Sequence, residues 1–147
     1  MNFNSLNEIA SYIVSDGKGI LAADESNPTC TKRFDSIGVE STEENRRDYR
    51  ELLFRAEGMK GNIGGVILFD ETIRQKAADG TSLVDIINAQ GALPGIKVDK
   101  GLSAIGDSEE SLTQGLDGLD ERLKEYFELG AKFTKWRAVI NIGEGMP

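Results

Sequence analysis

Four short apolar runs, separated by amphipathic stretches, constrain the fold of this chain more than any other feature. They cover residues 19–24, 65–70, 94–99 and 133–140. Each run is almost continuously apolar, which is typical of strands that are buried on both faces. Because a helical pattern separates each run from the next, we expect parallel strands joined by right-handed helical crossovers. The sequence therefore predicts an α/β fold in which four parallel strands alternate with helices.

Helical patterns fill the intervals between the runs, and a further one precedes the first run. The expected helices span residues 5–14, 42–56, 83–91 and 116–130. Ser41 and Glu44 have the spacing of a capping box, which would begin the second of these helices. The third and fourth are expected to end at Gly91 and Gly130, since a glycine commonly ends a helix.

The composition excludes several classes of site. The 147 residues are 39% hydrophobic, which is enough for one globular domain with a core of its own. A net charge of −8 argues against a nucleic-acid partner, since phosphate contacts need clustered Lys and Arg. The chain has no histidine and a single cysteine, Cys30. Zinc sites built on His or Cys, His-based triads and disulfide frameworks are therefore excluded, and we expect no metal.

The sequence also bears on location. No segment approaches the ~20 apolar residues that span a bilayer. The first five residues carry no cationic or apolar leader pattern. We therefore expect no membrane segment and a reducing, cytoplasmic location, in which Cys30 is a small hydrophobic residue of a loop.

Two architectures are compatible with alternating strands and helices. A doubly wound sheet would carry a glycine-rich phosphate loop after its first strand. The glycines within residues 61–65 precede a strand instead, and they lack the G-x-G-x-x-G spacing. A (β/α)₈ barrel fits better, because every run carries its charges toward its carboxyl end, where barrel enzymes have their sites. We expect the first half of a (β/α)₈ TIM barrel, forming one partial domain over residues 1–147.

The charges at the strand ends point to an anionic ligand. Side chains alternate along a strand, so Lys135 and Arg137 share one face, while Trp136 lies on the other and is expected to pack against helices. If the charged faces are luminal, Asp24, Lys97, Lys135 and Arg137 converge on one mouth of the barrel. Three cations against one carboxylate exceed the needs of ion pairing, and the surplus suits a sugar phosphate.

A purely structural interpretation of these charges stays open. Asp99 supplies a second carboxylate, so Asp24 and Asp99 could pair with Lys97 and Arg137 inside the barrel. The remaining charges near strand ends are interpreted as solvated or supporting residues: Glu25, Glu71 and Lys100.

Six blocks of the sequence are distinctive. They are GKGILAADES at 17–26, TEENRR at 42–47, GGVILF at 64–69, GIKVDKG at 95–101, QGLDGL at 114–119 and KWR at 135–137. In this order, and over nearly the whole chain, they resemble the class I (Schiff-base) fructose-bisphosphate aldolases. The number and length of the blocks leave no room for a chance match.

This resemblance implies a barrel that cleaves fructose 1,6-bisphosphate into dihydroxyacetone phosphate and glyceraldehyde 3-phosphate through a lysine Schiff base, without a metal. It implies that Asp24 handles protons around the C4 hydroxyl and the carbinolamine. Lys135 would support Schiff-base formation and carbon–carbon cleavage. The resemblance further implies that four residues hold the C6 phosphate of the substrate: Lys97, Arg137, Ser26 and Thr29.

The chain departs from the family pattern in two respects. Pro28 stands where the family often has Gly or Ala, in the loop that carries Ser26 and Thr29. The resemblance also places the Schiff-base lysine on the sixth strand and two glutamates on the fifth, beyond residue 147. We therefore expect the nucleophile to lie outside this chain.

Four strands alone would leave two unpaired sheet edges and an open luminal face. We expect the C-terminal half of the barrel, or another copy, to cover them, and a homo-oligomer for the full-length protein. On its own the chain is expected to be marginally stable, aggregating or oligomeric. Two functions stay open: the first part of a working aldolase, or a non-catalytic sugar-phosphate-binding or assembly module that needs a complementing C-terminal half.

Overall fold

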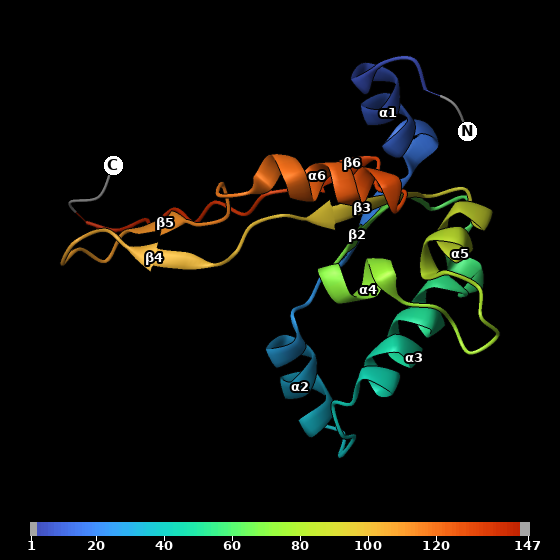
Figure 1. Ribbon diagram of the computed structural model, residues 1–147, viewed down its shortest axis with the longest axis horizontal. Helices are drawn as coiled ribbons and strands as arrows, with labels where there is room; N and C mark the ends of the chain where they lie inside the picture. Colours follow the sequence, from blue (N-terminus) through green and yellow to red (C-terminus); the bar gives the residue numbers. More distant parts are fainter. Residues whose placement is uncertain (1–2, 145–147) are drawn as a thin grey trace.

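A four-stranded parallel sheet is the framework of the computed structural model, which describes residues 3–144 (Figure 1). Its strands are β1 (Gly19–Ala23), β2 (Ile63–Leu68), β3 (Leu93–Lys97) and β6 (Phe133–Lys135). They pair in the order β1-β2-β3-β6, and all three pairings are parallel. The predicted set of four parallel strands is confirmed.

Helices precede the sheet and connect its strands. They are α1 (Leu6–Ile13), α2 (Asn27–Asp35), α3 (Glu43–Phe54), α4 (Asp70–Arg74), α5 (Leu83–Ala89) and α6 (Leu119–Glu128), with 3₁₀ turns η1 (Ser15–Gly17) and η2 (Glu57–Met59). The sequence reasoning missed α2 and α4. It also missed an antiparallel hairpin of β4 (Leu102–Ala104) and β5 (Ser111–Thr113). Between residues 3 and 144, no helix combines the length and the apolar composition needed to cross a bilayer.

The start of α3 differs from the prediction by one residue. Thr42 Oγ1 accepts a hydrogen bond from the Asn45 N–H at 3.1 Å, so Thr42 is the capping residue. A cap side chain bonds the N–H of the second or third helical residue, and Thr42 has this spacing. The predicted cap, Ser41, instead offers its carbonyl oxygen to Arg46 Nη1.

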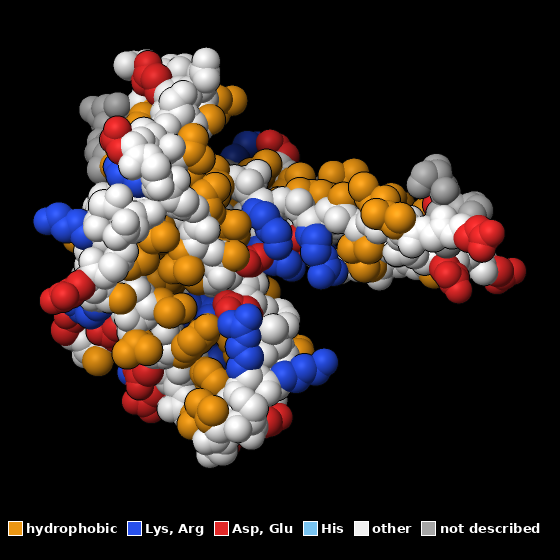
Figure 2. Space-filling view, turned by 180° about the vertical axis from the view of Figure 1, so that it is seen from behind, with side chains coloured by type: hydrophobic (Ala, Val, Ile, Leu, Met, Phe, Trp, Pro, Cys, Tyr) orange, Lys and Arg blue, Asp and Glu red, His pale blue; other side chains and the backbone are white. Residues whose placement is uncertain are grey.

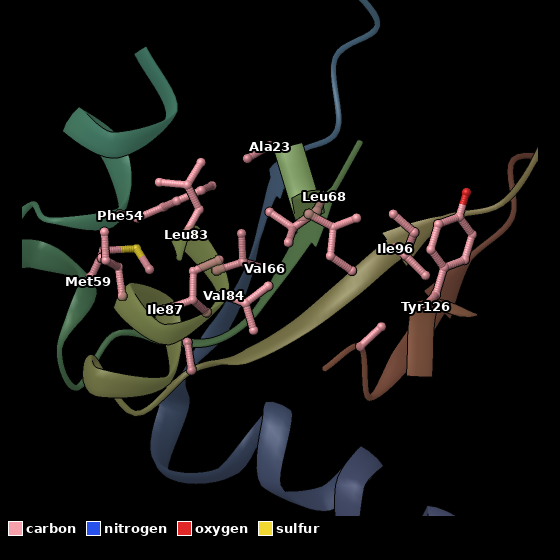
Figure 3. Packing of buried hydrophobic residues seen from close by; sticks show 14 of the residues in the cluster. Ala23, Phe54, Met59, Val66, Leu68, Leu83, Val84, Ile87, Ile96 and Tyr126 are labelled. Atoms are coloured by element: carbon pink, nitrogen blue, oxygen red, sulfur yellow. The ribbon is translucent and has the colours of Figure 1, made fainter. Parts of the chain in front are cut away.

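The hydrophobic core lies between the sheet and the helices on its outer face (Figure 3). Its largest fully buried aliphatic and aromatic members come from β2, β3, α3 and α5: Val66, Leu68, Ile96, Phe54, Leu83 and Ile87. Burial of one such side chain contributes about 1.5–3 kcal/mol. This layer fixes the strands against the helices and thereby fixes where the strands end.

The opposite face of the sheet, the luminal face, is open over β1. Ile20 is 46% exposed and Ala22 is exposed as well, so the predicted burial of this strand on both faces was wrong. Strand β3 does show the predicted pattern, with Leu93 to Ile96 all buried. No element within residues 3–144 covers the luminal side of β1, as expected for half of a barrel.

Strand β6 is shorter than the run predicted at 133–140. It ends at Lys135, and the chain then leaves the sheet to run beside β5 (Figure 1), where the Thr113 hydroxyl donates a hydrogen bond to the Arg137 carbonyl oxygen at 2.7 Å. The expected packing of Trp136 against helices was wrong, because this side chain is 37% exposed. The physical reason is that β6 is an edge of the sheet, without a further strand among the described residues to pair with.

Helix α1 packs against the amino-terminal end of the sheet. Ile13 is buried there, and a Cβ placed on Gly64 of β2 would lie 1.9 Å from the Ile13 carbonyl oxygen. The Tyr12 hydroxyl donates a hydrogen bond to the Gly91 carbonyl oxygen at 2.7 Å. A glycine at position 64 is therefore required for this close approach of two backbones. Helix α1 covers the end of the sheet opposite to the strand ends that carry the charges.

We expect the substitution Gly64→Ala to destabilise the 147-residue chain by about 3 kcal/mol, because the added methyl group overlaps main chain that cannot move without unseating α1. Gly58→Ala is the matched control, since no heavy atom lies within 4 Å of its added Cβ. Thermal unfolding of the two variants measures the difference. Equal melting temperatures would contradict the close packing of α1 against Gly64 of β2.

Candidate functional site

An open groove of about 800 Å³ lies at the carboxyl ends of the parallel strands. It is lined by all six residues to which the sequence assigned a role: Asp24, Ser26, Thr29, Lys97, Lys135 and Arg137. Parallel strands end at the same edge of a sheet, which explains how residues far apart in the chain meet here. The structure brings the six together, and their roles stay predictions.

Asp24 and Lys135 form an ion pair across the groove. Lys135 Nζ donates a hydrogen bond to Asp24 Oδ2 at 2.8 Å. The Asp24 side chain is only 12% exposed and that of Lys135 is 32% exposed, so water screens this pair only in part. The contact joins the ends of β1 and β6, which are the two edges of the sheet.

Asp99 neutralises Lys97 and leaves Arg137 without a carboxylate. Lys97 Nζ lies 3.1 Å from Asp99 Oδ1, an ion pair whose angles fall outside those of a hydrogen bond, and the Asp99 side chain is 1% exposed. The other carboxylate oxygen accepts the Arg137 backbone N–H at 3.4 Å. Within residues 3–144 the Arg137 guanidinium forms no ion pair, although it lines the groove.

The purely structural interpretation of the charges is thus only partly right. Asp99 pairs with Lys97, as that interpretation allows, but Asp24 pairs with Lys135. Arg137, which that interpretation paired with a carboxylate, remains available to a ligand in the described part of the chain.

Ser26 and Thr29 belong to the start of helix α2, not to a loop. The Ser26 carbonyl oxygen accepts the Thr29 N–H at 2.9 Å, and the two hydroxyl oxygens lie 3.1 Å apart. Pro28 occupies the first turn, where its missing N–H leaves no hydrogen bond unmade. Cys30 was wrongly expected in a loop, since it is a buried residue of α2. The amino terminus of α2 presents two hydroxyls to the groove, and helix amino termini favour anions.

Cationic side chains slightly outnumber acidic ones around the groove. The six cations are Arg74, Lys97, Lys100, Arg122, Lys135 and Arg137. The five anions are Asp24, Glu25, Asp70, Asp99 and Glu125. One excess positive charge is notable on a chain of net charge −8, and it favours an anionic ligand. Figure 2 shows Lys and Arg side chains gathered at the notch between the body and the protruding hairpin.

A network on one wall of the groove was not foreseen. Arg74 forms ion pairs with Asp70, at 2.9 Å, and with Glu125, while the Tyr126 hydroxyl donates to Asp70 at 2.9 Å. Burial opposes the charged form of Asp70, but the hydrogen bonds from Arg74 and Tyr126 outweigh it and lower the pKa of Asp70. Burial and the contact with Asp70 raise the pKa of Tyr126. The sequence pattern placed residue 70 at the end of a predicted strand, but without α4 it did not place Arg74 one turn further on.

Glu25, which also lines the groove, and Glu71 are supporting residues held in ion pairs. The Glu25 side chain is 11% exposed and forms ion pairs with Arg33 and Arg50. The charge of Glu25 raises the pKa of Arg33 against the effect of burial. Glu71 accepts hydrogen bonds from Arg46 Nε at 2.8 Å and Nη2 at 2.6 Å, which lower the pKa of Glu71, also against burial. These pairs tie α2 and α4 to α3.

The comparisons with known proteins agree with the sequence blocks. Residues 5–147 match the family profile described as fructose-bisphosphate aldolase class-I. The chain belongs to this family. Its sheet of four parallel strands with crossover helices corresponds to the first part of the aldolase TIM barrel, as predicted.

The relatives of this aldolase family member are much longer than the chain itself. A probable fructose-bisphosphate aldolase class 1 of Xanthomonas axonopodis pv. citri is 55% identical over 148 residues, which are 100% of this chain and 44% of the relative. The cytosolic fructose-bisphosphate aldolase 6 of Arabidopsis thaliana is 56% identical over 94% of this chain and 39% of its own length. The chain thus spans less than half the length of these relatives.

A solved structure of the family superposes closely on this chain. It is the aldolase of Plasmodium falciparum in a ternary co-crystal structure with TRAP and a small-molecule inhibitor, with a TM-score of 0.93 and 52% sequence identity. The match covers 97% of this chain and 42% of the Plasmodium chain. The geometry of the strands and helices described above is therefore that of an aldolase barrel over the matched part.

The Arg46–Glu71 contact predicts a specific pH dependence of stability. Because the folded protein lowers the pKa of Glu71, the contribution of this carboxylate is complete above its unfolded value of 4.5 and is lost as the pH falls through the lowered value. We expect Glu71→Gln to cost about 1 kcal/mol at pH 7. The difference in melting temperature from the unsubstituted chain should begin to shrink as the pH falls below 4.5.

Thermal melts at a series of pH values measure this difference. Glu128→Gln is the control, because Glu128 is exposed and has no ion pair among the described residues. A difference for Glu71→Gln that does not change at any acid pH at which both proteins still fold would show that the Glu71 carboxylate is not held as described.

Proposed function

We propose that this chain supplies part of the active site of a class I fructose-bisphosphate aldolase. The enzyme would cleave fructose 1,6-bisphosphate into dihydroxyacetone phosphate and glyceraldehyde 3-phosphate through a lysine Schiff base. The observation that carries the proposal is the meeting of Asp24, Lys97, Lys135 and Arg137 around one groove, in a chain that belongs to this family.

The Asp24–Lys135 pair is suited to moving protons at the reacting carbons. A carboxylate and an ammonium 2.8 Å apart form a ready donor and acceptor pair in a site that is partly shielded from water. We assign Asp24 to proton handling at the C4 hydroxyl and the carbinolamine, and Lys135 to Schiff-base formation and carbon–carbon cleavage. The partial burial of both groups supports these roles, because charges act more strongly there than in bulk water.

Lys97, Arg137, Ser26 and Thr29 are suited to the C6 phosphate. Arg137 supplies a guanidinium without a carboxylate partner among the described residues, and a guanidinium matches the geometry of phosphate oxygens. Lys97 adds charge from β3, and the two hydroxyls add donors at the amino terminus of α2. The single excess positive charge of the groove supports this assignment.

The Schiff-base lysine is assigned to a residue outside positions 1–147. Neither Lys97 nor Lys135 matches the family position of that nucleophile. The complementing part of the barrel is then the partner that this chain requires. We also propose that residues 1–147 form one partial domain and that the full-length enzyme is a homo-oligomer. We propose a cytoplasmic location, because the Arabidopsis relative is named as cytosolic. No nucleic-acid partner and no metal are part of this proposal.

A chimera tests the proposal directly. It joins residues 1–147 to the part of the Xanthomonas relative that this chain does not cover. We expect borohydride to trap dihydroxyacetone phosphate covalently on the chimera and leave the 147-residue chain unlabelled. A lysine in the Xanthomonas part should carry the adduct in peptide mass spectra.

Two results would contradict the proposal. An adduct on Lys97 or Lys135 of the isolated chain would place the nucleophile within it. A folded chimera that neither forms an adduct nor cleaves fructose 1,6-bisphosphate would favour the alternative of a non-catalytic module.

A further inference from the structure

Arg50 of α3 is a buried cation that contacts the segment joining β1 to α2. It is 2% exposed. Its Nη1 lies 2.8 Å from Glu25 Oε2 in an ion pair with angles outside those of a hydrogen bond. Its Nη2 donates a hydrogen bond to the Glu25 backbone carbonyl oxygen at 2.9 Å. One guanidinium therefore holds both the side chain and the main chain of Glu25.

Side chains of α2 and α3 add further contacts around Glu25 and Arg50. Arg33 of α2 pairs with Glu25 Oε1, and the Tyr49 hydroxyl of α3 donates to the same oxygen at 3.3 Å. Arg50 Nη2 also lies 3.6 Å from Cys30 Sγ of α2. The end of β1, helix α2 and the middle of α3 are thus joined at a single residue, Glu25.

Burying a guanidinium has a desolvation cost that an apolar side chain of similar volume does not have. Taking such a charge out of water costs several kcal/mol, and an apolar side chain of similar volume often serves a core at least as well. Arg50 does not line the groove, so it does not contact a ligand there. Its two shortest polar contacts are both with Glu25, the residue that lies between Asp24 and Ser26.

We propose that Arg50 is a positioning residue: through Glu25 it holds Asp24 and the Ser26–Thr29 turn in the orientation that the substrate requires. The inference rests on the proposed aldolase function for its kinetic consequence, but its structural part stands without it. Asp24 and Ser26 flank Glu25 in the sequence. A displacement of Glu25 therefore moves a proton-handling carboxylate and a phosphate-binding hydroxyl together. A shift of about 1 Å in such groups can cost about 100-fold in rate.

Hydrogen exchange of the chimera tests the structural part. In the unsubstituted protein the Thr29 and Cys30 amides bond to the Ser26 carbonyl oxygen at 2.9 and 3.0 Å. We expect Arg50→Met to speed exchange in peptides covering residues 24–30 at least tenfold. Arg55→Met, at the carboxyl-terminal cap of the same helix, should leave those peptides unchanged, because Arg55 pairs with Glu51 and Asp79 and not with residues 24–30.

Steady-state kinetics test the functional part with two ketose phosphates. Arg50→Met should lower kcat/KM for fructose 1,6-bisphosphate about 100-fold. For fructose 1-phosphate, which lacks the C6 phosphate, the loss should be about tenfold, because only the contribution of Asp24 is affected. A merely structural role would lower the amount of folded enzyme and reduce both rates by the same factor. Arg50→Lys, which keeps the charge but cannot reach both groups of Glu25, should recover part of the loss.

Several results would overturn the inference. Unchanged exchange in residues 24–30 would show that Arg50 does not hold the segment, whether or not the chimera is active. Equal losses for the two substrates would reduce Arg50 to a stability residue. If Arg50→Met does not fold, Glu25→Gln and Arg50→Lys decide by the same two measurements. A chimera that lacks activity even without substitution refutes the proposed function, and the exchange data still decide on Arg50.

Discussion

The ion pair between Asp24 and Lys135 is the contact on which the geometry of this site depends. The two residues lie at the ends of β1 and β6, the opposite edges of a four-stranded sheet. Adjacent strands lie about 4.8 Å apart, so three spacings in a flat sheet would separate the edges by about 14 Å. That is farther than an aspartate and a lysine side chain reach together. A separation of 2.8 Å therefore requires a sheet that is already curved toward a barrel.

Glycines on the luminal face accompany this curvature. A Cβ on Gly95 would lie 2.3 Å from Cζ of Phe133, and one on Gly65 would lie 3.1 Å from the same ring. The ring of Phe133 thus lies over β2 and β3 where neither strand carries a side chain. Lys135 follows on the same face of β6, which directs its ammonium group across the groove toward Asp24. The core on the outer face holds the strands in place while the luminal side remains free for charged groups.

The periodicity of the sequence was sufficient to predict the sheet and the gathering of its charges. Continuous apolar runs predict buried strands, and the carboxyl ends of parallel strands must meet, so the groove of Asp24, Lys97, Lys135 and Arg137 follows from local patterns. The errors occur where burial depends on distant parts of the chain. Strand β6 ends at Lys135, and Trp136 is exposed, because nothing among the described residues pairs with that edge.

Local sequence patterns also failed to predict the structure where polar residues have structural roles. Helix α2 has a sparse apolar pattern, since Cys30 and Phe34 are its only buried residues, and Pro28 was taken as a disturbance when it marks a helix start. Arg50 falls among the charged residues of α3, where burial would not be expected from pattern alone. Its contact with Glu25 spans 25 positions and becomes visible only once α2 and α3 are placed side by side.

A crystal structure of the chimera with bound fructose 1,6-bisphosphate tests most directly whether the residues at the strand ends form one phosphate-binding site. We expect the C6 phosphate to lie within hydrogen-bond distance of the Arg137 guanidinium and the Ser26 and Thr29 hydroxyls, with Lys97 beside it and Lys135 still adjacent to Asp24. A substrate bound with its phosphate remote from Arg137, or a groove in which Arg137 pairs with a protein carboxylate instead, would contradict it.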